Sequence, residues 1–435
     1  MPMKLPKPFF GWYLVLGGIF VNLIMGAGIV GYIANVFMDP MREEFGWTRT
    51  QFMFGFTLSQ ISMAFTGLMI GRLVDKHGAR RFMLAGTVII FFALIATSYI
   101  QQLYQWLLIR GLFQGVALVL AGNMVVTVTI AKWFVKYRGR AIGLIALGLS
   151  FAGIIIPNLM TFIVDNYGWR FGWNFLAILT LITILPCSLI MRKRPEDYNL
   201  LPDGIKKSAD TKNDPLEEYD YQFSLTRKEA IRLPSFWVIL LSYNLVGVAI
   251  LTIATLTIPF MSDYGFSRTQ SAQFIAVLAF PGVFTRPFWG LLAEKILIKF
   301  LASFAFLAVG IGMAIVVYGA NETSLFYATI GYFITGLGLA GSQPVKEVLW
   351  PIYFGRKNLG SIRGFVMAFE LVVHGSGPIL ATWYSENLGS YGDTFTFLSI
   401  FAIIASILIY LAREPAERQF AEIFIGKKLL PNKND

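Results

Sequence analysis

The chain has 435 residues, of which 56% are hydrophobic and 14% are charged. Soluble domains have about 25% charged residues, so this composition excludes a water-soluble protein. The net charge of +11 lies in short basic clusters between apolar stretches, which argues against a nucleic-acid-binding surface. Cys187 is the single cysteine, so no intrachain disulfide is expected and the residue is predicted to serve packing.

Apolar stretches of about 20 residues, the length that spans a bilayer, recur along the whole chain. They predict an all-α membrane protein with twelve transmembrane helices. The first stretch, from Gly11, is too long for a cleavable signal peptide, and we expect it to act as an uncleaved signal. The predicted spans are 11–36, 50–71, 82–100, 103–130, 140–164, 170–191, 235–261, 270–293, 300–319, 324–350, 364–387 and 391–412.

One long polar break, residues 192–234, divides the chain and is predicted to be a cytoplasmic linker. It would separate an N-terminal six-helix bundle, residues 1–191, from a C-terminal one, residues 235–412. Residues 413–435 form a predicted cytoplasmic tail.

An internal repeat supports two pseudo-symmetric halves. The hexapeptide from Gly46 to Gln51 recurs in similar form from Gly265 to Gln270. The register continues further along, where Gly71, Leu73, Asp75 and Lys76 match Gly290, Leu292, Glu294 and Lys295. Parallel halves around a site at mid-membrane are typical of secondary transporters.

The distribution of basic residues predicts the orientation, because Lys and Arg collect on the cytoplasmic side of a membrane. Alternate loops on one side carry only Arg42, Arg49, Arg170 and Arg268. The other side carries Lys4, Lys7, Arg72, Lys76, Arg80, Arg81, Lys132, Lys136, Arg138, Arg140, Arg192, Lys193, Arg194, Arg356, Lys357 and Arg363. We therefore expect a multi-pass protein of the cell membrane, in a bacterial inner membrane, with both termini in the cytoplasm.

The segment from Gly71 to Arg81, expected between the second and third spans, resembles the loop signature of the major facilitator superfamily. The resemblance implies the major facilitator fold and a cytoplasmic latch. In this latch Gly permits close helix packing, and the Asp forms an ion pair with its Arg and Lys neighbours that alternates with the transport cycle. The alternative is a solvated positively charged loop. The candidate latch residues are Gly71, Arg72, Asp75, Gly78, Arg80 and Arg81.

A second motif, Thr285-Arg286-Pro287-Phe288-Trp289-Gly290, looks like the Arg-Pro signature of the monocarboxylate transporter and oxalate-formate antiporter branch. Further similarities are Phe10-Gly11-Trp12, Lys132-Trp133-Phe134 and Tyr353-Phe354-Gly355-Arg356. Two positions depart from that branch. Gly282 stands where the animal carriers have an Asp one turn before the Arg, and Tyr32 lies near the place of their lysine in the first helix.

Arg286 is the strongest candidate for substrate binding. It lies eight residues before Glu294 at the helix end, about 12 Å by helical rise, which places it near mid-bilayer. Its counterpart in the first half is Gly67, so the arginine is not part of the repeated scaffold. A charge at that depth costs about 2.5–3.5 kcal/mol on insertion scales, so it needs a wet cavity or a partner. Its planar guanidinium fits a carboxylate, and a structural ion pair is the alternative.

Glu370 and His374 are candidates for proton coupling. They lie four residues apart and share one helix face. Histidine titrates near neutral pH, and a carboxyl in a membrane span can bind a proton more readily than in water. A satisfied polar contact between helices is an equal alternative.

Other polar residues in the spans are weaker candidates. Arg110 could guide anions or form a structural pair, and Lys346 is expected to extend to the membrane interface beside Glu347. Tyr32, Asn123 and Tyr332 are chosen as further substrate-binding candidates, because they fall on helices that commonly line the cavity of the resembled fold.

Together these features predict a secondary transporter for a small organic anion. The expected substrate is a monocarboxylate such as a lactate- or pyruvate-like acid, carried by alternating access, with a proton as candidate co-substrate. The alternative is a major facilitator exporter of cationic or lipophilic compounds. No Walker motif is present, and no cluster of catalytic or metal-binding residues indicates an enzyme, a cofactor or a metal. No obligate protein partner is expected.

Overall fold

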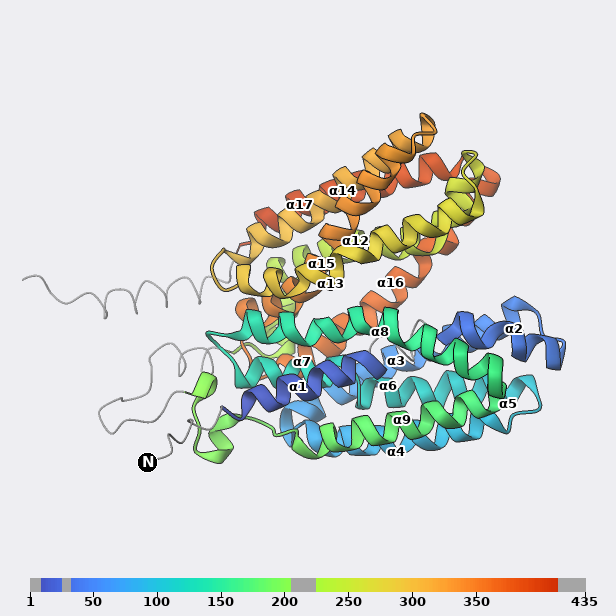
Figure 1. The fold of residues 1–435 in the computed structure, drawn as a ribbon. Coiled ribbons are helices and arrows are strands. Elements are labelled where there is room, and N and C mark those ends of the chain that lie inside the picture. Colours follow the sequence, from blue (N-terminus) through green and yellow to red (C-terminus); the bar gives the residue numbers. More distant parts are fainter. Residues whose placement is uncertain (1–8, 26–32, 205–223, 414–435) are drawn as a thin grey trace, which may run out of the picture. The chain divides into compact units, whose positions relative to one another are not determined.

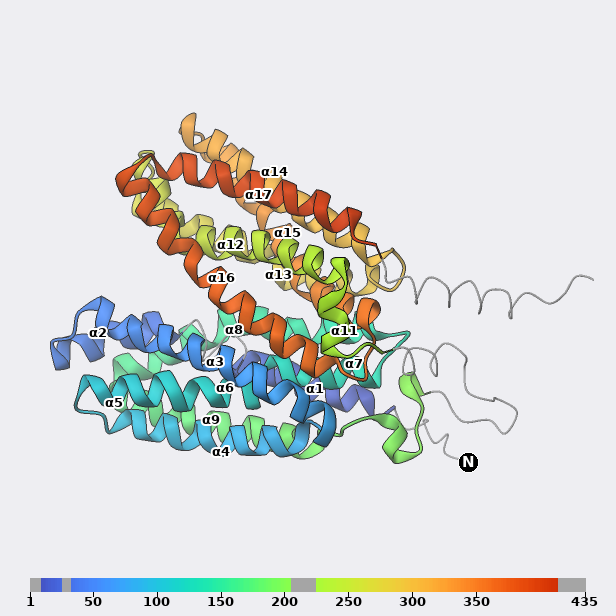
Figure 2. The same cartoon turned by 180° about the vertical axis from the view of Figure 1, so that it is seen from behind.

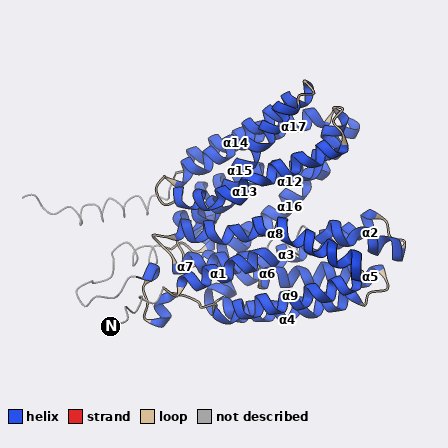
Figure 3. Ribbon diagram, viewed as in Figure 1, coloured by secondary structure: helices blue, strands red, loops and turns tan. Residues whose placement is uncertain are grey.

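The computed structural model describes residues 9–25, 33–204 and 224–413. Within these ranges the regular structure is helical, without strands, as Figure 3 shows. Eleven helices of the described residues are long and apolar enough to cross a membrane, and Gly11–Met25 forms a shorter apolar helix. The expected all-α fold is confirmed. The first predicted span includes residues 26–32, which lie outside the described residues, as does the predicted tail from residue 414 onward.

The chain forms two compact units. Unit 1 comprises Met1–Gln222 together with Arg356–Gly364 (Figure 1). Within it, α4 packs along α9, and α1 contacts α7, α8 and α9. Its helices are α1 Gly11–Val21, α2 Ile33–Phe45, α3 Arg49–His77, α4 Ala79–Ser98, α5 Leu103–Leu108, η2 Ile109–Gln114, α6 Gly115–Leu120, α7 Asn123–Trp133, α8 Arg138–Tyr167, α9 Trp169–Ile190, η3 Pro195–Tyr198 and η4 Pro202–Gly204.

Unit 2 comprises Phe223–Gly355 and Phe365–Asp435. In it, α14 packs against α15 and α17, and α13 also packs against α15 (Figure 2). The helix α16 begins in unit 1 and continues in unit 2. The helices are α11 Arg227–Arg232, α12 Pro234–Asp263, α13 Arg268–Leu292, α14 Ile298–Asn321, α15 Leu325–Phe354, α16 Leu359–Asn387 and α17 Tyr391–Leu411.

The repeated hexapeptides start α3 and α13 in the same way. Thr48 and Ser267 each accept a hydrogen bond from the backbone N–H three residues on, and the glutamine there accepts one in return. These capping boxes satisfy backbone groups that a helix end leaves without partners. The preceding Gly46 and Gly265 have φ of +68° and +85°, a conformation that favours glycine. The sequence repeat thus encodes two equivalent helix starts.

The helices extend beyond the predicted spans. The second span was expected to end at residue 71, but α3 continues to His77, so most of the expected loop motif is helical. Polar and charged residues such as Arg and Lys are good helix formers, and a helix can therefore continue past its apolar part. The chain turns only at Gly78, where φ is +83°.

Small residues form a close helix contact in unit 2, between α14 and α15. A methyl group on Gly331 would lie 2.6 Å from the backbone nitrogen of Val316. A methyl group on Gly312 of α14 would lie 2.5 Å from the backbone nitrogen of Thr335 and 2.8 Å from the carbonyl oxygen of Gly331. Such contacts let helix backbones approach closely in a membrane.

We predict that Gly331→Ala destabilises the protein by about 1–3 kcal/mol, because the added methyl group overpacks a rigid backbone contact. The matched control is Gly375→Ala in α16, where no atom lies within 4 Å of the added group. That variant should be neutral or gain stability, since Ala favours a helix over Gly by about 1 kcal/mol. Thermal unfolding in detergent measures both. Equal melting temperatures for the two variants would contradict the close packing.

Candidate functional site

Arg286 lies in α13 between Pro281 and Pro287 and is half-buried. Its guanidinium folds back along its own helix onto Gly282. A methyl group on Gly282 would be 3.5 Å from Nε and 3.6 Å from Cζ of Arg286. The position at which the resembled carriers have an Asp is therefore in van der Waals contact with this guanidinium, and here it contributes no side chain.

Lys346 of α15 and Glu370 of α16 form a buried ion pair in unit 2. Lys346 Nζ lies 3.1 Å from Glu370 Oε2, and their side chains are 9% and 8% exposed. The expectation that Lys346 extends to the membrane interface is wrong. An acidic side chain on the neighbouring helix binds the ammonium inside the unit, so the lysine does not need to reach water.

His374 lies one turn beyond Glu370 on the same helix and packs against α12. Its imidazole hydrogen-bonds to the backbone of Tyr243, while Nε2 is buried and has no hydrogen-bond partner among the described residues. The ring occupies the space that a side chain at Gly247 would need. Gly247 thus lets the imidazole come close to α12, and Lys346, Glu370 and His374 form one polar cluster.

Arg110 occupies the interior of unit 1 and is 1% exposed. It belongs to η2, a π-helical segment within the predicted fourth span, and such segments are frequent at functional sites. Arg110 Nη1 donates to Gln114 Oε1 at 2.8 Å, and Gln114 Nε2 donates to Thr97 Oγ1 at 2.9 Å. Its guanidinium carbon also lies 4.0 Å from the ring centre of Phe56. Arg110 is therefore held in place by a hydrogen-bond network and by an aromatic ring.

Of the remaining substrate-binding candidates, Tyr332 lies in the same unit as Arg286 but at a distance from it. Asn123 is half-buried at the start of α7 in unit 1, and its side chain accepts a hydrogen bond from Thr127. Tyr332 is fully buried and stacks on Phe274, with ring centres 5.0 Å apart. Phe274 is twelve residues before Arg286 in α13, about 18 Å by helical rise. Tyr32 lies outside the described residues.

Asp75 is the centre of the candidate latch, and the residues that it contacts all belong to unit 1. Its Oδ1 accepts hydrogen bonds from Lys132 Nζ at 2.7 Å and from the backbone N–H of Gly360 at 3.0 Å. Its Oδ2 accepts from the N–H of Ser361 at 2.8 Å. These amides belong to the first turn of α16, where a carboxylate is favoured by the unsatisfied N–H groups and the helix dipole. Gly71 touches the backbone of Gly360 directly.

The other latch residues serve differently. Gly78 ends α3 with a positive φ, and a side chain there would overlap Lys193. The side chains of Arg72, Arg80 and Arg81 are exposed. The lysine that pairs with Asp75 comes from α7 and is distant in sequence, although the motif suggested a neighbouring basic residue.

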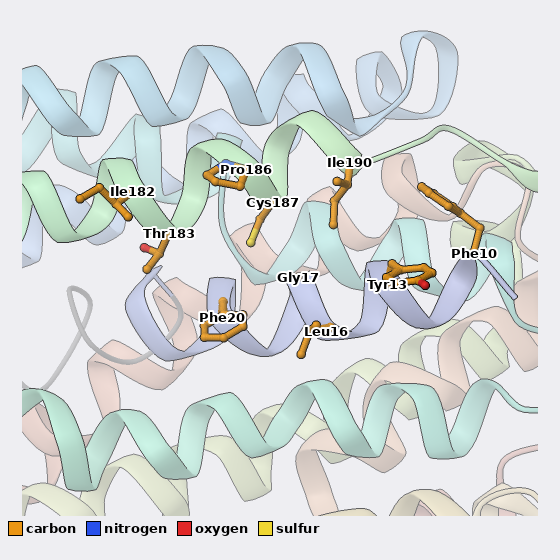
Figure 4. Close-up of a pocket in the computed structure, with 10 residues that line it drawn as sticks. All are labelled: Phe10, Tyr13, Leu16, Gly17, Phe20, Ile182, Thr183, Pro186, Cys187 and Ile190. Carbon is orange, nitrogen blue, oxygen red and sulfur yellow. The ribbon is translucent and has the colours of Figure 1, made fainter. Parts of the chain in front are cut away.

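A groove of about 520 Å³ lies between α1 and α9 of unit 1, and Figure 4 shows the residues that line it. Cys187 and Thr183 of α9 line it opposite α1, and Gly17 gives it room. Leu16 and Ile182 on its rim are 53% and 66% exposed. The lining has no charged group, so this groove suits apolar chains rather than an anion.

A family comparison agrees with this architecture. The model of the Major Facilitator Superfamily matches residues 18–345, which is more than half of the chain. The chain belongs to the Major Facilitator Superfamily. Its family and fold are those of transporters and not of enzymes. The solved structure of the proton:xylose symporter XylE is similar in fold, with a TM-score of 0.70 at 14% identity, covering 93% of this chain and 95% of that one.

Two relatives within the superfamily are informative. Monocarboxylate transporter 4 of Gallus gallus is 24% identical over 448 aligned residues, covering 100% of this chain and 90% of the relative. An MFS-type transporter of Gibberella moniliformis is 32% identical over 201 residues, covering 43% of this chain and 45% of the relative. The chain thus spans less than half of the fungal relative and nearly the full length of the animal one.

We predict that Asp75→Asn loosens the first turn of α16, since breaking a buried ion pair typically costs about 3–5 kcal/mol. In a Cys187→Ser background, maleimide labelling of Ser361→Cys measures this, and Asp75→Asn should accelerate it at least several-fold. Glu44→Gln is the control: Glu44 is an exposed acid whose pKa is held below its ordinary value by a hydrogen bond from Arg170. Equal labelling in both variants would show that Asp75 does not hold this turn.

Proposed function

We propose that this transporter is a secondary carrier of a small organic anion, with a monocarboxylate such as lactate or pyruvate as the substrate class, working by alternating access. The main support for this proposal is Arg286, a half-buried cation within a membrane-spanning helix. The similarity to an animal monocarboxylate transporter over the whole chain supports the same substrate class.

The chemistry of Arg286 fits this role. A guanidinium presents parallel N–H donors that match the two oxygens of a carboxylate, and the pairing is stronger where water is scarce. At Gly282 no side chain of the same helix face covers the guanidinium from the preceding turn. An arginine placed in this way favours anions over the cationic or lipophilic substrates of the alternative exporter.

Proton coupling is proposed through Glu370 and His374, because Gly282 stands where the animal carriers of that branch have an Asp one turn before the Arg. Arg110, Asn123 and Tyr32 remain proposed contributors from unit 1, whereas the complete burial of Tyr332 suits a packing role better. For the cell, we propose a multi-pass protein of a bacterial inner membrane with both termini in the cytoplasm, as the distribution of Lys and Arg supports.

The proposal predicts that Arg286→Ala loses carboxylate affinity. A hydrogen bond to a charged group contributes about 1.5–3 kcal/mol, which corresponds to roughly 10- to 100-fold in binding. Uptake of labelled lactate, pyruvate, formate and oxalate into proteoliposomes should fall accordingly, and Arg286→Lys should recover part of it because it keeps the charge.

The control is Arg170→Ala, which removes an exposed arginine whose side chain is 44% exposed. Its uptake should equal that of the wild type, because exposed ion pairs contribute little. Normal uptake of every acid by Arg286→Ala would rule out the carboxylate role. Absence of uptake by the wild type, with every acid, would reject the proposed function.

A further inference from the structure

We propose that Lys346 is a second binding station for the substrate's carboxylate, and that Glu370 is an internal counter-ion that leaves Lys346 when it takes up a proton. This inference rests on the proposed anion transport and deepens it. It assigns Lys346, which the sequence placed at the membrane interface, to the transport pathway, and it assigns the proton to a definite carboxylate.

The ion pair between Lys346 and Glu370 is an unfavourable choice if its role is only to stabilise the fold. Both side chains lie in spanning helices and are less than 10% exposed. Desolvation of two charges often exceeds their attraction, so apolar residues of similar size generally stabilise a fold as well or better. Ionisable residues at such positions in membrane proteins commonly belong to ion and proton pathways.

The packing of α13 on α15 places Lys346 apart from Arg286. Trp289, three residues beyond Arg286, packs on Gly341, and Lys346 follows five residues later. By helical rise, Lys346 is therefore about 12 Å further along the bundle than Arg286. Leu278 packs on Gly336, so the two helices run in the same direction. One carboxylate would bind to the two cations in sequence.

Charge balance supplies the coupling rule. With the pair closed, Lys346 and Glu370 together carry no net charge. When a substrate carboxylate binds Lys346, Glu370 loses that ammonium as its counter-ion, and a proton taken up from solution restores the charge balance. Conversely, a protonated Glu370 without substrate leaves Lys346 as an unpaired buried cation. Two states are therefore favoured: the closed ion pair without substrate, and the state in which Lys346 binds one acid anion and Glu370 binds one proton. No covalent bond to carbon is made or broken in this exchange.

The surroundings of Glu370 suit this exchange. Lys346 faces it from α15, and His374 lies one turn further on its own helix, α16. From α12 the backbone of Tyr243 binds the imidazole. Because Nε2 has no partner among the described residues, the nitrogen bound to the Tyr243 carbonyl is Nδ1, which carries the hydrogen. The imidazole is thus fixed on α12 beside Glu370, and of the two proton-coupling candidates this inference assigns the transported proton to Glu370.

The test measures binding and protons together. Purified full-length protein in weakly buffered detergent is titrated with pyruvate, with lactate in parallel, while a pH indicator reports proton uptake. The wild type should take up about one proton per bound anion. The Glu370→Gln variant should take up almost no protons and should bind pyruvate with an affinity independent of pH. The Lys346→Gln variant should bind pyruvate at least tenfold more weakly than the wild type.

The matched control is Glu347→Gln, since Glu347 is adjacent to Lys346 and 7% exposed. It removes an equally buried carboxylate, and we expect proton uptake to stay at about one per anion. The double variant Lys346→Gln with Glu370→Gln leaves no unpaired charge and should fold even where a single variant does not. It should bind pyruvate weakly and without proton uptake.

Two results would overturn the inference. One is proton uptake of about one per anion in Glu370→Gln. The other is wild-type pyruvate affinity in the double variant, which would mean that the pair is only structural. If the wild type binds and transports none of the acids, the proposed function fails and this inference fails with it. If the wild type transports them and these variants behave like it, this inference alone fails.

Discussion

An ionised side chain inside a membrane-spanning helix must be compensated, and the polar interior of this protein is organised by that constraint. Arg110 is enclosed by Gln114 and Phe56, and Lys346 is paired with Glu370. Arg286 is held against Gly282 on its own helix. Because each such charge raises the free energy of a span, the few that are present must contribute either to structure or to transport.

Each unit contains a buried ion pair between a lysine and a carboxylate, and the two pairs have different surroundings. In unit 1 the buried lysine, Lys132, shares the carboxylate of Asp75 with backbone amides at the start of α16, which is a structural arrangement. In unit 2 the buried lysine pairs with a glutamate beside a histidine. The first carboxylate is fixed by a helix start. The second has a proton-binding group as its neighbour, and we propose that it is exchangeable.

Much of the fold could be predicted from the sequence, because apolar length, basic loops and a repeated hexapeptide each report a local physical requirement. Thr48 and Ser267 are helix caps that the repeat encodes directly. The helix ends were less predictable, since the charged residues after Gly71 continue α3 although they are too polar for a span. The break in the fourth span into η2 had no signal in the apolar pattern.

The candidate site was only partly predictable, because spacing reveals neighbours on one helix but not between helices. Glu370 and His374 followed from their separation by four residues, whereas the ion pair with Lys346 joins two different helices, α15 and α16.

The central claim is that a substrate carboxylate crosses the membrane with its charge balanced by a proton. Simultaneous recording of labelled pyruvate uptake and membrane current in the same proteoliposomes tests it most directly. The account predicts uptake without net current, and a current of about one charge per acid would contradict it.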